Sequence, residues 1–487
     1  MFFGLNGAPS SVMAIVLIEI HSIMENPQFV KSRPLGSLLS AVHKPSLALL
    51  AVMFSAASVA NASAEAAVAR KPNVIVILAD DMGYGDLGCQ GTVEDVRTPH
   101  IDTLAANGVR FTQAYVTAPQ CGPSRAALLS GRYQNRFGFE SNEWAYNPGM
   151  PRSVSLISER LKEQGDYATG YIGKWGITSK RHSYPPKRGF DESYWVQDGN
   201  IYFPDTPSKY NTQMHRDMEP IVMEEYSTDA FGREALEFID RHEADPFFLL
   251  ISYITPHEPM EAKESDLERF AHIEDPLRRT TLAMIACMDD NVGEMLETLK
   301  DKGLEEDTLI FFLSDNGGYP GNGSLNTPYR GTKSQMLDGG IHVPFLMQWK
   351  GKLPAGEVYE EVVSSLDILP TTLSVAGAAV QPEWQLDGVN LLPYIVGAAS
   401  GVPHETLFWR YKAWSKKPEQ DGWAIRKGEW MLVRNGWGQT APALYHLGDD
   451  PEQCKDLSKT QPERYDDMLK LWTRWDQGNA VPGSITK

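Results

Sequence analysis

The sequence predicts an α/β protein with a large, mainly parallel sheet sandwiched by helices, followed by a smaller C-terminal antiparallel sheet plus one helix. From Lys71 onward, short apolar runs alternate with stretches of helical period, which is typical of repeated βα units. After about Val402 the chain instead shows aromatic runs separated by Gly turns. With 487 residues, 42% of them hydrophobic, the chain can bury one large core or two unequal ones.

The individual elements follow from periodicity and from helix start and stop signals. The segment 98–108 predicts a helix with Thr98 as its N-cap, Pro99 in its first turn and Gly108 as its end. Further helices are expected at 153–165, 227–242, 277–303 and 462–477. Apolar runs predict strands at 73–80, 246–255, 308–315 and 343–349, and the antiparallel sheet is expected at 406–414, 422–436 and 443–453.

Three parts of the chain are expected: an N-terminal extension with a signal peptide (1–64), an α/β catalytic domain (65–400) and a C-terminal antiparallel subdomain (401–487). The leader is inferred from basic residues up to Lys44, an apolar run from Leu47 to Ala60, and A-x-A sites that end near Ala62 or Ala64. This run is too short for a membrane anchor, so export to the periplasm or outside the cell is expected, without stable membrane insertion. Met24 is a plausible true start.

Charge and cysteine usage exclude several classes of protein. The net charge of −18 argues against nucleic-acid binding, which needs a basic face. The four cysteines are too few and too scattered for a disulfide framework, and no spacing suggests zinc. If the substrate is an anion, the basic side chains that bind it must therefore cluster at the binding site, because the chain as a whole is acidic.

Two predicted strands end in polar pairs: Asp80 with Asp81, and Asp315 with Asn316. In open α/β sheets, ligands bind outside the carboxyl ends of the strands. Carboxylates that converge there need a cation, and an all-oxygen set suits calcium or magnesium better than zinc. A single Asp in such a place commonly just caps a turn, but two pairs favour a metal site.

Cys121 lies in a turn flanked by Pro and Gly, and Arg125 follows four residues later at the start of a predicted helix. At that spacing the two side chains share a helix face, and a thiol beside an arginine would have a depressed pKa that suits a nucleophile. A buried structural cysteine with Arg125 in an ion pair explains the residues equally well.

Three more residues follow βα positions and could supply local positive charge. Lys174 ends the probable strand in "GYIGKW", His257 follows a strand in "YITPHEP", and Lys333 lies in a loop bounded by Gly. Each alone reads as a surface or turn residue. Together with Arg125 they indicate a small tetrahedral anion, or its ester, as substrate.

Nine segments in order, from about Lys71 to the C-terminus, resemble the formylglycine-dependent sulfatases, which are arylsulfatase-like enzymes of the alkaline phosphatase superfamily. They are "ADDMGYGDLGCQG", "TPHIDTLAANGVRFTQAY", "CGPSRAALLSGRY", "GYIGKW", "RGFD", "TPHEP", "SDNGG", "GTKSQMLDGGIHVPF" and "LYHLGDDPEQ". C-x-P-S-R followed by L-x-G-R is the most specific of these. The segment 200–239 looks most like sulfatases of bacteria that degrade algal polysaccharides such as carrageenan or ulvan.

The resemblance implies that a formylglycine-generating enzyme converts Cys121 to formylglycine, whose hydrate can release a bound sulfuryl group by collapsing to the aldehyde. It further implies a calcium ion held by Asp80, Asp81, Asp315 and Asn316 and touching the modified Cys121. Arg125 would hold the diol, Lys174 and Lys333 would grip the sulfate, and His257 with Lys333 would protonate the leaving group. A sulfated carbohydrate is the expected substrate.

Two positions depart from the family pattern. Gly176 stands where the family usually has a histidine that assists sulfate release, which leaves that step without its usual base; His182, His257 or a metal-polarised water could replace it. His342 stands where arginine is more usual, which hints at a changed substrate pocket. The alternatives to a sulfatase are a phosphoester or phosphonate hydrolase on the same scaffold, and a sulfated-glycan binding protein without turnover.

Overall fold

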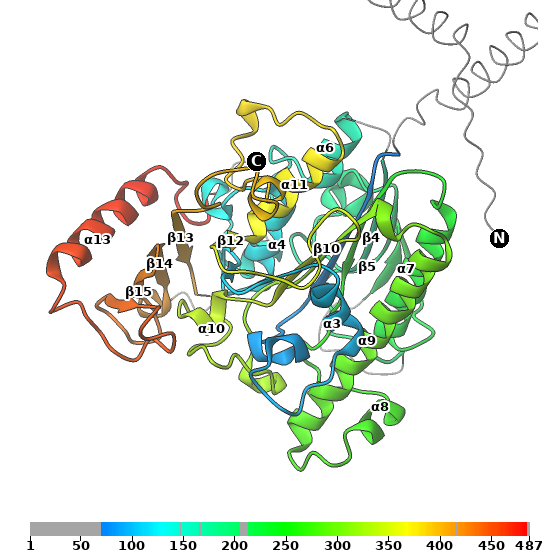
Figure 1. Ribbon diagram of the computed structural model, residues 1–487, viewed down its shortest axis with the longest axis horizontal. Helices are drawn as coiled ribbons and strands as arrows, with labels where there is room; N and C mark the ends of the chain where they lie inside the picture. The colour runs from blue at the N-terminus through cyan, green and yellow to red at the C-terminus, as the bar shows by residue number, and fades with distance from the viewer. Residues whose placement is uncertain (1–69, 147, 165–166, 205–212, 414–416, 485–487) are drawn as a thin grey trace, which may run out of the picture. The chain divides into compact units, whose positions relative to one another are not determined.

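The computed structural model describes residues 70–487, apart from 147, 165–166, 205–212, 414–416 and 485–487. Arg70–Lys487 forms one compact unit (Figure 1). The expected signal peptide lies outside the described residues. The division between 65–400 and 401–487 stays a prediction.

A ten-stranded sheet forms the centre of the fold, in the order β11-β2-β10-β9-β1-β8-β4-β5-β6-β7. Its five neighbouring strands from β9 to β5 are all parallel. Antiparallel pairs flank them, β9 with β10 on one side and β5 with β6 on the other. The predicted mainly parallel sheet is thus confirmed, with antiparallel flanks. The strands are β1 (Asn73–Ala79), β2 (Val109–Phe111), β4 (Ala168–Lys174), β5 (Glu192–Val196), β6 (Met214–Arg216), β7 (Glu219–Ile221), β8 (Phe247–Ser252), β9 (Thr308–Ser314), β10 (Phe345–Trp349) and β11 (Glu357–Tyr359).

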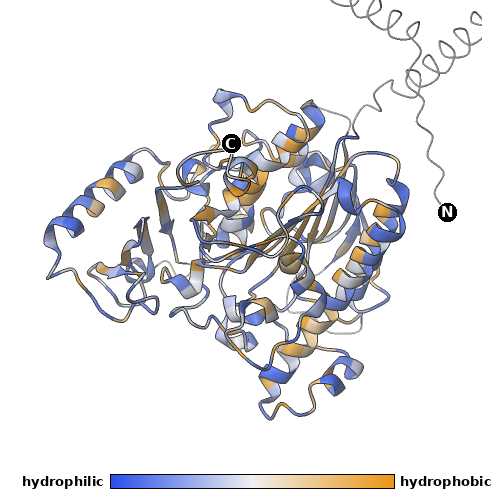
Figure 2. Cartoon of the chain, in the orientation of Figure 1, coloured by the Kyte–Doolittle hydropathy of each residue, from blue (hydrophilic) through white to orange (hydrophobic). Residues whose placement is uncertain are grey.

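Helices cover both faces of this sheet, which is why its central strands are apolar throughout. In β1, Val74, Val76 and Leu78 face one core, and the residues between them face the other. The first core is closed by α4 (Cys121–Ser130), α6 (Ile157–Gln164) and α11 (Ile368–Val375), and the second by α3 (Pro99–Ala106), α7 (Ser227–Arg241) and α9 (Pro276–Asp301). In Figure 2 apolar residues are concentrated in the central strands and recur along these helices between polar ones.

The predicted C-terminal unit is an antiparallel sheet of four strands with one helix packed on it. Its elements are β13 (Thr406–Tyr411), β14 (Gly422–Lys427), β15 (Trp430–Arg434), β16 (Ala443–His446) and α13 (Pro462–Gln477). Alternate residues of β13 serve two cores: Leu407 and Trp409 pack with residues near Met336, and Phe408 packs toward α13. The small sheet is therefore joined to the main body through a shared apolar core.

The remaining elements are short connections. They are the parallel pair β3 (Ala114–Tyr115) and β12 (Val363–Ser364), and the helices α5 (Glu143–Tyr146), α8 (Glu264–Arg269), α10 (Asp338–Ile341) and α12 (Leu392–Ile395).

Truncation of a core side chain tests this packing of helices on both faces of the sheet. Phe311 of β9 is fully buried between the sheet and the first set of helices. Phe311→Ala should lower the free energy of unfolding by about 3–5 kcal/mol, because lost burial and a cavity add. Val358→Ala in β11, where the side chain is exposed, should cost less than about 0.5 kcal/mol in the same denaturant titration. Equal losses in the two variants would contradict the described layers.

Candidate active site

Four polar residues meet at the carboxyl edge of the sheet because β1 and β9 are parallel neighbours that end in register. Asp80 and Asp81 follow β1, Asp315 and Asn316 follow β9, and all four are buried. The Asp81 amide donates to Asp315 Oδ1 at 3.3 Å, and Asn316 Nδ2 donates to Asp81 Oδ1 at 2.8 Å. The structure thus brings together both polar pairs that the sequence singled out.

Cys121 begins helix α4, and its sulfur lies against this cluster. The Sγ atom is 3.2 Å from Asp80 Oδ1 and 3.8 Å from Asp81 Oδ1. The residue is only 3% exposed, so it occupies a buried helix start and not an open turn. Asn142 accepts the Gly122 amide at 2.8 Å, which helps to fix this first turn.

The prediction of a depressed thiol pKa is wrong. Burial raises the pKa of Cys121 well above its ordinary value, and the charges of Asp315 and Asp80 raise it further. The positive charge of Arg125 is taken up by those same carboxylates. A thiolate at Cys121 is therefore disfavoured, which argues against an unmodified sulfur nucleophile.

The Arg125 guanidinium, one helical turn after Cys121, spans four neighbouring strand ends. Its Nε donates to Asp315 Oδ2 at 2.8 Å, beyond β9, and its Nη2 lies 3.4 Å from Asp80 Oδ2, beyond β1. Its Nη1 donates to the Lys174 carbonyl at the end of β4 at 2.9 Å and to the Ser252 hydroxyl at the end of β8. Arg125 thereby fixes helix α4, which Cys121 begins, over the sheet edge.

Two lysines reach the same carboxylates from different elements. Lys174 Nζ donates to Asp80 Oδ2, and Lys333 Nζ donates to Asp81 Oδ2 at 2.7 Å. Burial opposes their charge, but Asp80 raises the pKa of Lys174, and Asp81 raises the pKa of Lys333 well above its ordinary value. Both lysines therefore remain cationic at neutral pH, as anion binding requires.

His257 also joins the cluster, with Nε2 3.6 Å from Asp81 Oδ2. Burial, followed by the charges of Lys174 and Lys333, lowers the pKa of His257 to about 4. The ring is consequently neutral at neutral pH. Its Nδ1 lies 2.6 Å from the Glu258 carbonyl, which favours the tautomer with hydrogen on Nδ1 and a free lone pair on Nε2.

The carboxylates do not share one protonation behaviour. Burial alone would raise the pKa of Asp80, but the surrounding cations, Lys174 foremost, hold it well below its usual range. Burial, together with the charge of Asp80, raises the pKa of Asp315 to about 7. Because the Asp315 carboxyl group is only partly ionised near neutral pH, a further cation beside it would stabilise its charged form.

The oxygen atoms of this cluster suit a hard cation, whereas the sulfur of Cys121 and the imidazole of His257 do not. One ligand atom each from Asp80, Asp81, Cys121 and His257 lies within 4.8 Å of the others. In addition, Asn316 Oδ1 is buried and has no hydrogen-bond partner, which is a costly state for an amide oxygen. A calcium or magnesium ion bound to these oxygens would remove that cost.

The structure does not bring His342 to this cluster. The ring is fully buried, its Nε2 lies 2.8 Å from the Thr112 carbonyl, and it stacks on Tyr329 at 4.1 Å. Its expected contact with substrate is not supported, because the ring has no exposed face. His182, a candidate base, is exposed in the short 3-10 helix Arg181–Ser183.

Several supporting residues belong to none of the sequence motifs named above. Asp81 adopts a left-handed backbone with φ of 63°, and its carbonyl accepts from Asn322 Nδ2 at 3.2 Å and from Ser324 Oγ at 3.0 Å. Ser252, which binds Arg125, is simply the last residue of β8. The position of Ser252 at the end of a strand was the one sequence signal that could have indicated its role. No sequence signal indicated Asn322 or Ser324, the loop residues that bind the Asp81 carbonyl.

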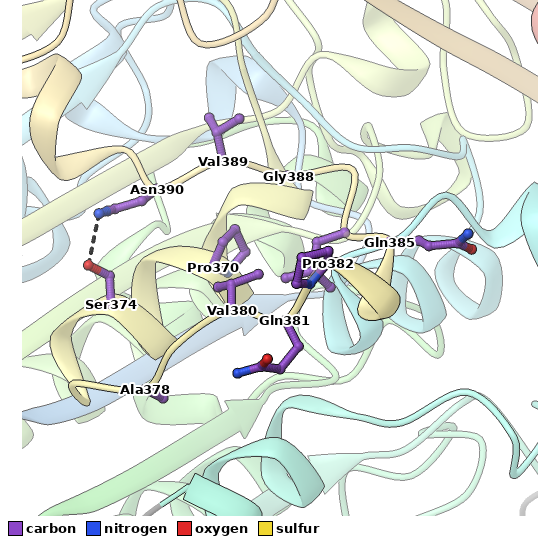
Figure 3. A pocket seen from close by; sticks show the side chains of 11 residues that line it. Pro370, Ser374, Ala378, Val380, Gln381, Pro382, Gln385, Gly388, Val389 and Asn390 are labelled. Atoms are coloured by element: carbon purple, nitrogen blue, oxygen red, sulfur yellow. Dashed lines mark hydrogen bonds between the residues drawn. The ribbon is translucent and has the colours of Figure 1, made fainter.

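A separate hollow of about 550 Å³ lies beside α11 (Figure 3). Pro370, Val380 and Pro382 line it, and Asn390 donates to Ser374 at 2.9 Å across one side. No residue of the cluster above and no ionisable side chain lines this hollow. It therefore does not suit a sulfate or phosphate group.

Comparisons with known proteins place the chain in one family. Residues 72–378 match the sulfatase family, and residues 332–476 match the family described as N-sulphoglucosamine sulphohydrolase, C-terminal. N-acetylgalactosamine-6-sulfatase of Canis lupus familiaris is 32% identical over 494 residues, covering 89% of this chain and 90% of the relative.

Solved structures agree with this placement. The crystal structure of Ps i-CgsB in complex with k-i-k-neocarrahexaose has 34% sequence identity and a TM-score of 0.80, and covers 86% of this chain and 95% of that one. The phosphonate monoester hydrolase of Agrobacterium radiobacter shares the fold at 20% identity and a TM-score of 0.60, over 84% of this chain and 95% of that one.

The fold and the site thus define a hydrolase of sulfuric esters. The chain belongs to the sulfatase family, and PsFucS1 sulfatase from Pseudoalteromonas sp. shares its fold. Within the described residues, none of the helices combines the length and apolar composition that crossing a bilayer requires.

Loss of the Arg125 side chain should damage both folding and activity. Arg125→Ala leaves Asp315 and Asp80 buried without their partner, so the free energy of unfolding should fall by about 3–5 kcal/mol and sulfate release should be lost. Arg241→Ala, which breaks an exposed pair with Glu192, should cost at most about 1 kcal/mol and leave turnover intact. Thermal unfolding and sulfate release of the two purified variants check this; similar behaviour of both would contradict the role of Arg125.

Proposed function

We propose that the protein hydrolyses sulfate esters of sulfated carbohydrates, using a formylglycine made from Cys121 and a bound calcium ion. The observation that carries this proposal is the position of Cys121 Sγ, 3.2 Å from Asp80, inside a cluster that also holds Lys174 and Lys333. The proposed nucleophile therefore lies next to both the metal ligands and the groups that would bind the sulfate. The aldehyde hydrate would supply a hydroxyl nucleophile where the thiol is held protonated.

The calcium ligands are proposed to be Asp80, Asp81, Asp315 and Asn316. The buried, unpartnered Asn316 Oδ1 and the carboxylate oxygens support an oxygen-only site. When bound, calcium would neutralise charge on the sulfate and lower the pKa of the attacking hydroxyl. The modified Cys121 would lie against the same ion.

The cationic side chains divide the remaining work. Lys174 and Lys333 would bind sulfate oxygens, and Arg125 would hold the nucleophile in place. Because the pKa of Lys333 is raised and that of His257 is lowered to about 4, Lys333 is the better proton donor to the leaving alkoxide. The neutral His257 is then free to accept a proton, which makes it the replacement for the histidine absent at Gly176.

Two further parts of the proposal concern the cell. A formylglycine-generating enzyme would mature Cys121, and the leader expected in 1–64 would direct the chain to the periplasm or outside the cell. The carbohydrate class is supported by relatives, since one curated relative is named for N-acetylgalactosamine-6-sulfate and one solved relative holds a neocarrahexaose.

A substrate panel tests the proposed chemistry. The wild type should release sulfate from 6-sulfated N-acetylgalactosamine or from k-i-k-neocarrahexaose, measured by ion chromatography, and should be much slower on a phenyl phosphonate monoester. Preference for the phosphonate would instead favour phosphonate hydrolysis, for which the likeness in fold is the present support.

Removal of the metal should abolish turnover. Exhaustive chelation should stop sulfate release, and added calcium should restore it. Asn316→Ala should raise the calcium concentration needed for half-recovery, because one oxygen ligand is lost. Ser324→Ala, which removes a contact to the Asp81 backbone but no ligand, is the matched control. Full turnover of the metal-free enzyme would rule out the calcium site.

The two histidines that could replace the missing base are separable by mutation. His257→Ala should lower kcat by about 10²–10⁴, the usual contribution of a positioned acid or base, and His182→Ala should leave kcat unchanged. Rapid-quench kinetics on the wild type should locate the slow step after ester cleavage, seen as an initial burst of the leaving alcohol. A large loss in His182→Ala with none in His257→Ala would reverse this assignment.

A further inference from the structure

Two exposed aromatic side chains flank the loop that carries Lys333. Among the described residues, seven large hydrophobic side chains are exposed, and the two aromatic ones are Trp437 at 50% and Tyr319 at 38%. Both belong to segments that hydrogen-bond to the Lys333 loop, although they come from distant parts of the chain. Exposed aromatic rings on segments that contact a functional loop are typical of recognition surfaces.

Trp437 lies in the turn between β15 and β16 of the C-terminal sheet. Its indole Nε1 donates to the Ser334 carbonyl at 2.8 Å, one residue after Lys333. Next to it, Asn435 Oδ1 accepts the Met336 amide at 2.7 Å. Two hydrogen bonds thus hold the turn against the segment that follows Lys333. Half of the Trp437 surface remains exposed to solvent.

The same segment is fastened on its other side to the start of the nucleophile's helix. The Ser334 amide donates to the Pro119 carbonyl at 2.7 Å, and Gln120 Nε2 donates to Ser334 Oγ at 3.2 Å. Gln120 directly precedes Cys121. Through Ser334 and Gln120, the turn that carries Trp437 is therefore connected to the start of helix α4.

Tyr319 approaches the loop from the β9 side. The Lys333 amide donates to the Gly318 carbonyl at 3.1 Å, and Tyr319 is the next residue along the chain. Backbone strain also concentrates here, since Ser334 and Trp437 both adopt the left-handed region, with φ of 70° and 52°. A bulky residue in that region is uncommon and is retained where the surroundings fix it, often at functional sites.

We infer that Trp437 and Tyr319 form an aromatic pair that stacks on the sugar rings next to the sulfated one, at the mouth of the catalytic site. This inference rests on the proposed action on sulfated carbohydrates. The apolar C–H face of a pyranose covers an aromatic ring well, and the indole N–H, already satisfied by Ser334, holds the ring in place. The aromatic pair thus selects chains over single sugars, while the lysines bind the sulfate.

The test compares an oligosaccharide with a monosaccharide. Trp437→Ala should raise KM for k-i-k-neocarrahexaose about tenfold, the effect of one lost aromatic contact, with kcat nearly unchanged. The same variant should lose much less of its kcat/KM on 6-sulfated N-acetylgalactosamine, which has no neighbouring ring. Tyr319→Ala should act in the same direction, and Val396→Ala, an exposed residue after α12, should change neither substrate.

Trp437→Phe separates stacking from support of Lys333. Phenylalanine keeps an aromatic face but cannot donate to Ser334. If stacking binds the sugar, Trp437→Phe should therefore keep the KM for the oligosaccharide close to the wild-type value. If Trp437→Phe and Trp437→Ala instead lose kcat equally on both sugars, Trp437 positions the loop and the inference is wrong. Unchanged kinetics in Trp437→Ala also overturn it. If the wild type releases no sulfate from either sugar, the proposed function fails and this inference fails with it.

Discussion

The buried guanidinium of Arg125 is the contact on which the rest of the site depends. It bonds to groups at the carboxyl ends of β9, β8 and β4 and lies against the carboxylate that follows β1, and these are four consecutive strands of the sheet. Three buried carboxylates could not stay together without such compensation. Because Arg125 and Cys121 share the first turns of α4, the same contact that neutralises the acids also sets the position of Cys121.

The sequence predicted the fold well because its signals are local and strong. Apolar runs placed β1, β8 and β9, and the segment 462–477 coincides with α13. The polar pairs, Cys121, Arg125 and Lys174 were singled out because they lie at strand ends or begin a helix, and Lys333 because it lies in a loop bounded by Gly. Two details of the structure depend on tertiary packing and were not predictable in this way. The thiol pKa depends on burial and on which partners take the charge of Arg125, and the burial of His342 depends on packing against Tyr329, which no motif encodes.

Gly176 lies at the edge of the site, and its backbone conformation suits glycine. A Cβ atom there would lie 3.4 Å from Arg125 Cδ and 3.8 Å from Lys174 Cε, so this position borders the cation groups of the cluster. Its φ of 69° is a left-handed conformation that favours glycine and strains other residues. The local backbone is thus adapted to glycine, and under the proposed mechanism the proton transfer usually served from this position would fall to another group, for which the neutral His257 has the right protonation state.

The central claim is that Cys121 acts as an aldehyde hydrate and not as a thiol, since its surroundings keep a thiol protonated. Mass spectrometry of the tryptic peptide that ends at Arg125, taken from active enzyme made together with a formylglycine-generating enzyme, tests this claim most directly. The account predicts a peptide in which the sulfur and two hydrogens of Cys121 are replaced by one oxygen. A fully active preparation whose peptide carries only the unmodified thiol would contradict it.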